Sequence, residues 1–167
     1  MADSNRWHVV HPSAFAHEQE ALDLLRANLP DTPPFHAWSN FEFIAEDGSI
    51  NEVDALVVSA DCVYLIEIKH WNGHITGNQN TWTVMPPSGR VRHEENPLLL
   101  ANRKARKLKS LLSRQQAFRK AKPPFIQAVV FLSAQQCQVD LDEVAAQHIY
   151  QRTGIIDLIR GESSRRD

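Results

Sequence analysis

Cysteine is scarce in this chain of 167 residues: Cys62 and Cys137 are its two cysteines, and they form no CxxC pair. A disulfide framework and a cysteine-rich zinc site are therefore excluded, and a reduced, cytosolic setting is the default expectation. No apolar run approaches the length of a membrane span. The first residues lack the basic end and the apolar block of a signal peptide.

Several catalytic signatures are missing as well. The motifs GxxxxGK[ST], GxSxG and GxGxxG do not occur, so the sequence gives no support to ATP hydrolysis, serine esterase chemistry or dinucleotide binding. The histidines show no spacing typical of a zinc site. The composition does support one folded domain, because 43% of the residues are hydrophobic and 23% are charged.

Positive charge is concentrated in one segment, although the net charge of the chain is −2. Half of the 18 lysines and arginines lie between residues 103 and 122, where no acidic residue occurs. Such a basic face suits an anionic partner, but a charge-rich helix surface can equally be a solvated one. Asn102, Arg106 and Lys109 border the apolar stripe of this segment, and we expect them to turn toward a cleft.

The hydrophobic periodicity predicts an α/β fold. One helix is expected from Ser13 to Pro30, and another begins at Pro97. Apolar runs predict strands over residues 36–44, 52–59, 63–71, 81–85 and 125–133. A short helix and one further short element are expected within residues 140–160. The order of helix, three strands, helix and strand predicts an antiparallel meander followed by a crossover helix.

Three ionisable residues, Asp54, Glu67 and Lys69, lie within two predicted core strands. Charges in core strands are costly unless they neutralise one another or bind something. Because side chains alternate along a strand, Glu67 and Lys69 project from the same face, roughly 7 Å apart. Asp54 is on the neighbouring antiparallel strand, so its carboxylate is expected near that of Glu67.

A divalent cation is one way to relieve the repulsion between two close carboxylates. One or two carboxylates, completed by water, suit Mg²⁺ or Mn²⁺. Glu18 interrupts the apolar stripe of the first helix, and we expect it to reach toward the same cation. The adjacent lysine can pair with a carboxylate, orient a water or stabilise charge on a phosphate. A Glu-x-Lys pair on a strand is, however, most often a surface salt bridge. The positions of Asp54 and Glu18, which depart from the apolar pattern, favour a catalytic site instead.

The spacing of these residues resembles a known nuclease signature, the D…(D/E)xK pattern of the restriction-endonuclease-like superfamily, PD-(D/E)xK. More narrowly, the chain resembles the nuclease-related domain, NERD, over roughly residues 14–132. Cys62 and His17 stand where that family usually has glycine, away from the acidic positions. The resemblance rests on His17-Glu18 leading to Leu29-Pro30, on the strand from Glu52 to Val58, on the block from Cys62 through Lys69, Trp71 and Gly73 to Ile75, and on Asn96-Pro97.

The resemblance implies a restriction-endonuclease-like core, in which a mixed central β-sheet is flanked by helices in the order α-β-β-β-α-β. A single domain is implied, with its core over about residues 13–133 and an extension or linker over residues 134–167. Domains of this family commonly stand at the N-terminus of larger bacterial proteins, some of them in phage defence. Further domains of the same protein are therefore expected partners.

The resemblance also implies a Mg²⁺-dependent deoxyribonuclease, with RNA left open as a substrate. The implied catalytic set is Glu18, Asp54, Glu67 and Lys69. The implied ligands of Mg²⁺ or Mn²⁺ are Asp54, Glu67, the carbonyl of Ile68 and Glu18. Contacts to the DNA backbone would come from Asn102, Arg103, Arg106 and Lys109.

Two other functions stay open. A non-cleaving nucleic-acid-binding or regulatory module would keep this fold and bind DNA with strong salt dependence, but without turnover. A pure interaction domain would have its acidic cluster neutralised by Lys69 and nearby arginines. Mg²⁺ or Mn²⁺ would then leave its melting temperature unchanged, whereas an ion that binds the folded state must raise it.

Overall fold

The computed structural model describes residues 5–162, which form two β-sheets and three α-helices. The larger sheet is mixed and has six strands in the order β1-β2-β3-β4-β8-β10. Its strands β2, β3 and β4 form the antiparallel meander, and β4 pairs in parallel with β8. The bounds of these strands are β1 (Trp7–Val9), β2 (His36–Ile44), β3 (Ile50–Val58), β4 (Val63–Lys69), β8 (Ile126–Leu132) and β10 (Ile149–Tyr150).

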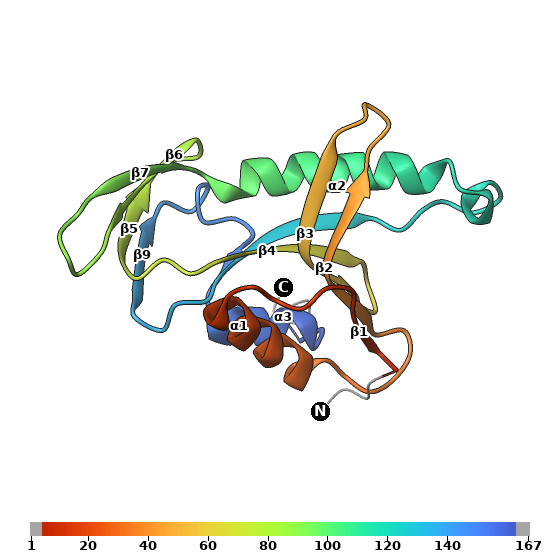
Figure 1. Ribbon diagram of the computed structural model, residues 1–167, viewed down its shortest axis with the longest axis horizontal. Coiled ribbons are helices and arrows are strands. Elements are labelled where there is room, and N and C mark those ends of the chain that lie inside the picture. The colour runs from red at the N-terminus through yellow and green to blue at the C-terminus, as the bar shows by residue number, and fades with distance from the viewer. Residues whose placement is uncertain (1–4, 163–167) are drawn as a thin grey trace.

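Helices cover both faces of the larger sheet (Figure 1). The crossover helix α2 (Pro97–Ser113) lies along one face, and α1 (Ala16–Asn28) and α3 (Arg152–Ile159) lie on the other. The start of α2 follows from its sequence, because Asn96 accepts a hydrogen bond from the amide of Leu98 and Pro97 needs no partner at the first helical position. A 3₁₀ turn (Gln116–Phe118) follows α2.

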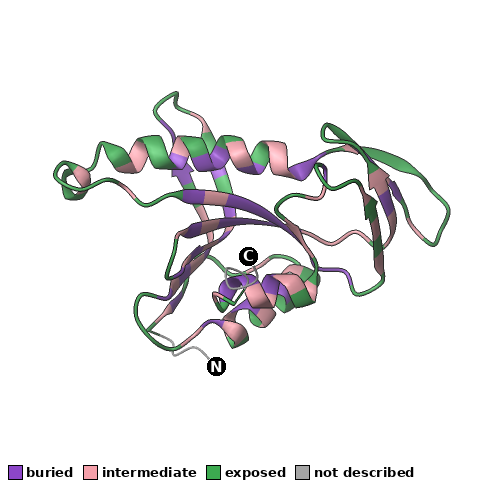
Figure 2. Cartoon of the chain, turned by 180° about the vertical axis from the view of Figure 1, so that it is seen from behind, coloured by how far each residue is buried: buried purple, intermediate pink, exposed green. Residues whose placement is uncertain are grey.

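Each face of the sheet has its own apolar core, and the two cores share the central strands β4 and β8, which Figure 2 shows as mostly buried. On the α2 side, Ala101, Ala105 and Leu108 pack against Leu65 and Ala128. On the opposite side, α1 and α3 contribute Leu22, Leu25, Ile155 and Ile159, which pack with Ile66, Val129 and Phe131. The continuous apolar runs of β4 and β8 follow from this burial on both faces.

A second sheet of four strands extends from one end of the molecule (Figure 1) in the order β7-β6-β5-β9. Trp82 and Ile75 of this sheet pack against Val130 and Leu132 of β8. Gly73 has a φ of 106°, and a Cβ there would collide with the Met85 carbonyl, which explains a glycine at this position. The strands are β5 (Gly73–Gly77), β6 (Thr81–Met85), β7 (Arg92–Glu95) and β9 (Cys137–Leu141).

The predicted mixed sheet with flanking helices is confirmed, and the strands at 36–44 and 81–85 have the predicted bounds. The first helix begins at Ala16 rather than at Ser13, because the hydroxyl of Ser13 donates to Glu18 and caps no backbone amide. Strands β1, β5, β7 and β9 were not anticipated, since they are short and rich in polar residues. Residues 163–167 of the predicted extension lie outside the described residues. None of the described helices has the length and apolar content needed to cross a membrane.

The position of α2 depends on a few apolar contacts, which a matched pair of leucines can test. Leu108 is 5% exposed, whereas Leu100, on the same helix, is 41% exposed. We expect Leu108→Ala to lower the free energy of unfolding by about 2–4 kcal/mol, because the cavity left at the sheet cannot fully collapse. Urea denaturation followed by circular dichroism measures the change. Leu100→Ala is the control and is expected to cost less than about 1 kcal/mol; equal losses would contradict this packing.

Candidate functional site

Asp54 lies where strands β3 and β4 separate. The last pair of the ladder joins Ala55 to Ile66, so Asp54 and Glu67 are the next residues on the two strands. The carboxylate of Asp54 accepts a hydrogen bond of 2.8 Å from the amide of Ile68. The side chain thereby takes the place that a carbonyl of β3 would have had in a continued ladder. The fork between the strands fixes the orientation of this carboxylate.

Asn40 adds a backbone irregularity opposite Asp54. The β2–β3 ladder pairs Ser39 with Ala55 and Phe41 with Val53, and Asn40 between them has a φ of 53°. Asparagine tolerates this left-handed conformation better than most residues do. Asn40 lines the same hollow as Asp54. Sequence reasoning gave Asn40 no role, because a lone asparagine in a strand carries no distinctive signal.

Glu67 forms a buried ion pair with Lys104 of α2. The amine lies 3.3 Å from one carboxylate oxygen, and the residues are 7% and 8% exposed. A buried carboxylate and a buried amine are each costly alone, so each is tolerated because of the other. Sequence reasoning placed Lys104 among the basic residues of the helix surface. Its spacing from Ala101 and Leu108 could have revealed it, because it puts Lys104 on the apolar stripe.

Glu18 projects from the first turn of α1 and is half-buried. The hydroxyl of Ser13 donates to it at 2.5 Å. Two contacts place α1 against the rest of the fold. Glu20 forms a double hydrogen bond of 2.8 and 2.6 Å with Arg152 of α3. The ring of His17 stacks on that of His70, which follows β4, at 4.7 Å between centroids.

The three carboxylates share one pattern. One oxygen of each is held by a protein donor: the Ile68 amide for Asp54, Lys104 for Glu67 and Ser13 for Glu18. Among the described residues, the second oxygen of each has no hydrogen-bond partner. The carboxylates are therefore oriented by the protein and keep an acceptor free for an external ligand.

Burial and mutual repulsion perturb Asp54 most strongly. Burial, together with the negative charge of Glu67 and then of Glu18, raises the pKa of Asp54 to about 7 from its ordinary 3.8. The hydrogen bond from the Ile68 amide and the charge of Lys104 act in the opposite direction. Asp54 is thus within electrostatic range of both Glu67 and Glu18. A carboxyl group in this state is typical of a functional site.

The donor set fits a hard divalent cation held by few protein ligands. Within residues 5–162, no three His, Cys, Asp or Glu side chains are grouped tightly enough to hold a metal by themselves. Mg²⁺ usually keeps several waters and binds one or two carboxylates, so the free oxygens of Asp54 and Glu67 suffice.

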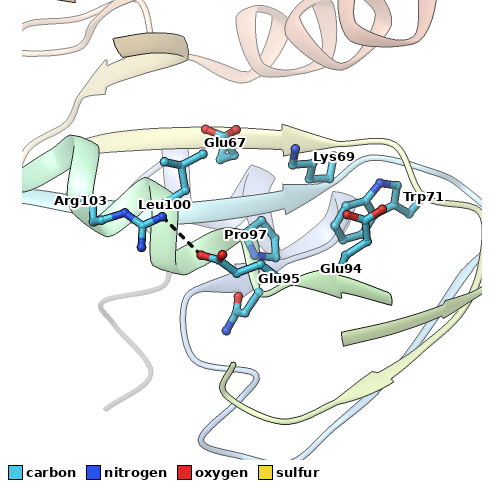
Figure 3. A pocket seen from close by; sticks show the side chains of 9 residues that line it. Glu67, Lys69, Trp71, Glu94, Glu95, Pro97, Leu100 and Arg103 are labelled. Carbon is cyan, nitrogen blue, oxygen red and sulfur yellow. Dashed lines mark hydrogen bonds and ion pairs between the residues drawn. The ribbon is translucent and has the colours of Figure 1, made fainter. Parts of the chain in front are cut away.

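Lys69 and Trp71 line the same hollow (Figure 3). The amine of Lys69 lies 5.7 Å from the centre of the Trp71 ring, and the guanidinium of Arg92 of β7 lies at the same distance from that ring. Lys69 and Glu67 line one hollow, with Arg103 of α2 across from them. Strand β4 ends at Lys69, so Trp71 lies in the link to β5 and not on the strand predicted over residues 63–71.

The four predicted catalytic residues line two hollows rather than one. Glu67 and Lys69 line the hollow on the α2 side, and Glu18 and Asp54 line the hollow on the α1 side. Asp54, at the fork, interacts electrostatically with both Glu18 and Glu67. The structure therefore does not gather the four residues into one pocket, and their predicted roles, with that of the Ile68 carbonyl, stay predictions.

The predicted nucleic-acid contacts separate into two groups. Arg103 lies beside the Glu67 hollow and pairs with Glu95 at 3.3 Å. Asn102, Arg106 and Lys109 line a different groove, between α2 and the start of β8. They turn toward a groove as expected, but not toward the acidic residues.

Comparison with known proteins agrees with this geometry. The family model of the nuclease-related domain, NERD, matches residues 13–133. The chain belongs to the NERD family. This NERD domain is 45% identical over 114 residues to a protein of Streptomyces coelicolor named "Probable kinase PglW". The match covers 68% of the chain but 7% of that relative, so the chain spans a small part of its length. No solved structure matches the chain.

The raised pKa of Asp54 predicts how stability depends on pH. Because its folded-state pKa is about 7 and its ordinary pKa is 3.8, the protonated group stabilises the fold at low pH, and this contribution is lost as the pH rises to 7. Asp54→Asn keeps an acceptor for the Ile68 amide but cannot ionise. We therefore compare the difference in unfolding free energy, variant minus wild type, at two pH values. This difference is expected to be larger at pH 8 than at pH 4, by roughly 1–3 kcal/mol. Urea denaturation with EDTA tests this; a pH-independent difference would contradict it.

The Lys104–Glu67 pair predicts a characteristic double-mutant cycle. Lys104→Met leaves Glu67 buried beside other carboxylates, so we expect the unfolding free energy to fall by about 3–5 kcal/mol. Adding Glu67→Gln to that variant is expected to recover most of the loss, which denaturation of all four proteins measures. Lys107→Met is the matched control, because Lys107 pairs with the exposed Asp47 and its loss costs about 0.5 kcal/mol. Additive losses in the cycle would show that the pair is not coupled.

Proposed function

We propose that this NERD domain hydrolyses phosphodiester bonds in DNA with the help of Mg²⁺ or Mn²⁺. The observation that carries the proposal is the set of three carboxylates at the β3–β4 fork, each oriented by one donor and each with an oxygen left for a ligand. RNA has the same phosphodiester linkage, and the assay below separates the two substrates.

The carboxylates would bind the ion in two ways, directly and through water. Asp54 and Glu67 would bind it directly through their free oxygens, together with the carbonyl of Ile68, and Glu18 would bind through water. The bound ion would supply Lewis acidity and lower the pKa of a coordinated water. Lys104 would hold the Glu67 carboxylate in one orientation throughout.

Lys69 is suited to act on the phosphate and the attacking water. Its amine projects from the same strand face as Glu67 and is held near the Trp71 ring. In this position Lys69 would orient the water and stabilise the negative charge that develops on the phosphate. Arg103, across the same hollow, would bind a phosphate oxygen, because its partner Glu95 is exposed and can be exchanged.

A second function, a non-cleaving nucleic-acid-binding module, has one observation in its favour. Lys104 pairs with Glu67, so a cation of the chain itself offsets the charge of this carboxylate. A protein of this kind would keep the fork as a structural feature and bind DNA without turnover. It differs from the hydrolase in one measurable respect, since the hydrolase requires an ion that raises the melting temperature.

The proposal extends to partners. We place this domain as one module among others in a larger bacterial protein, in the cytosol. The relative from Streptomyces coelicolor supports this, because the match covers 7% of its length. The kinase activity in that protein's name belongs to a protein far longer than the matched segment and is not assigned to this chain.

Cleavage assays test the hydrolase. We expect the wild type to cleave DNA in the presence of Mg²⁺ or Mn²⁺ but not with EDTA. Lys69→Ala should lower the rate by roughly 100-fold or more, as loss of one charge-stabilising donor does, and Asp54→Ala should abolish cleavage. Gel assays on circular and linear DNA, single- and double-stranded, and on RNA measure the rates.

Lys107→Met is the control, because Lys107 faces the β2–β3 turn, and this variant should cleave as the wild type does. Equal activity of wild type, Lys69→Ala and Asp54→Ala would reveal a contaminating nuclease and defeat the proposal. An inactive wild type whose melting temperature does not respond to Mn²⁺ would favour the non-cleaving module.

A further inference from the structure

The basic segment of residues 103–122 divides into two classes in the folded protein. Four of its nine cations have acidic partners: Arg103, Lys104, Lys107 and Arg114 pair with Glu95, Glu67, Asp47 and Glu46. Within the part of the chain that the structure describes, the other five form no ion pair: Arg106, Lys109, Arg119, Lys120 and Lys122. On α2 itself, Arg103, Lys104 and Lys107 are thus paired with acidic residues, whereas Arg106 and Lys109 form no ion pair with the described residues.

The groove on this basic side is separate from the acidic site. We call it the Phe125 groove; Asn102, Arg106 and Lys109 of α2 line it together with residues 125–128. At about 100° per residue, Asn102 and Lys109 lie roughly 160–180° around α2 from Leu100, which lines the Glu67 hollow with Arg103. Arg106 lies between the two flanks, and no residue lines both hollows. A ligand in the Phe125 groove would not occupy the metal site.

Phe125 gives this groove an unusual aromatic surface. Its side chain is 59% exposed, although it immediately precedes a buried strand. The amine of Lys109 lies 5.6 Å from the centre of its ring. An exposed ring with a cation beside it matches the two chemical parts of a nucleotide, the flat base and the phosphate.

Amide groups complete the lining of the Phe125 groove. Asn102 and Gln127 are both half-buried and lie in it. The side chain of Gln127 donates to the carbonyl of Ala128 at 2.9 Å, which orients its own carbonyl oxygen as an acceptor. Neutral amides can donate to and accept from base edges, whereas an acidic peptide would need only the cations.

We propose that the Phe125 groove binds a single strand of nucleic acid, with one unstacked base on the ring of Phe125 and the flanking phosphates at Arg106 and Lys109. A duplex keeps its bases stacked inside and offers none to the ring, so the exposed aromatic favours a single strand. This inference extends the proposed function by naming the form of substrate, and it concerns binding that requires no divalent ion.

Fluorescence anisotropy with labelled oligo(dT) in EDTA tests the proposal on the full chain. We expect Phe125→Ala to weaken binding about 10-fold without changing the salt dependence, because stacking involves no counterion release. Lys109→Ala should weaken binding and lower the slope of log K against log salt by about 0.7, the value for one phosphate contact on a single strand. Phe125→Trp should bind at least as tightly as the wild type.

Lys107→Met is the matched control, since Lys107 lies on the same helix but faces the β2–β3 turn, and it should bind as the wild type does. Equal binding by Phe125→Ala and wild type would overturn the proposal, as would tighter binding of a duplex of the same length. Competition by polyglutamate as strong as by unlabelled oligo(dT) would also overturn it. If binding depends on Phe125 but the protein cleaves no substrate, the proposed binding groove is supported and the proposed hydrolysis is contradicted. The failure of one proposal can therefore be distinguished from the failure of the other.

Discussion

The hydrogen bond from the Ile68 amide to Asp54 is the constraint on which the fork between β3 and β4 depends. Beyond Ala55 and Ile66 the two strands separate, and the Ile68 amide would be left unsatisfied in a half-buried place. The carboxylate satisfies this donor and is oriented by it. Where the strands separate, Asp54 comes within electrostatic range of Glu67 on one side of the sheet and of Glu18 on the other. One departure from regular pairing therefore produces both the position and the accessibility of the acidic cluster.

Helix α2 organises charge on both of its flanks. Toward the sheet it buries Lys104, which offsets part of the repulsion among the carboxylates. Three carboxylates and one amine still leave an excess of negative charge, and burial makes that excess costly. The folded protein is thus less stable than its packing alone would allow. A cation bound beside the carboxylates would offset this loss of stability. Functional sites commonly show this opposition between stability and affinity.

Local patterns made much of the fold predictable. The strands that carry Asp54 and Glu67 were recognisable because burial on both faces leaves a continuous apolar run, in which a charge is conspicuous. Lys104 was not recognised, although its spacing was visible, because its role depends on which strand the helix faces. Asn40 was missed for a similar reason, since its unusual φ has meaning only opposite Asp54. Helical periodicity predicted that Asn102, Arg106 and Lys109 turn toward a cleft. It could not predict that Phe125 lines the same groove, because that depends on how α2 packs against the segment before β8.

The acidic cluster draws its parts from distant stretches of the chain, from Glu18 in the first helix to Lys104 in the crossover helix. During synthesis on the ribosome, the early strands emerge well before α2 can dock, and until then Glu67 has no amine beside it. A truncated or half-folded polypeptide would hold the carboxylates without their counter-charge and without a fixed geometry. The acidic cluster therefore acquires its counter-charge and its fixed geometry only when α2 has docked on the sheet.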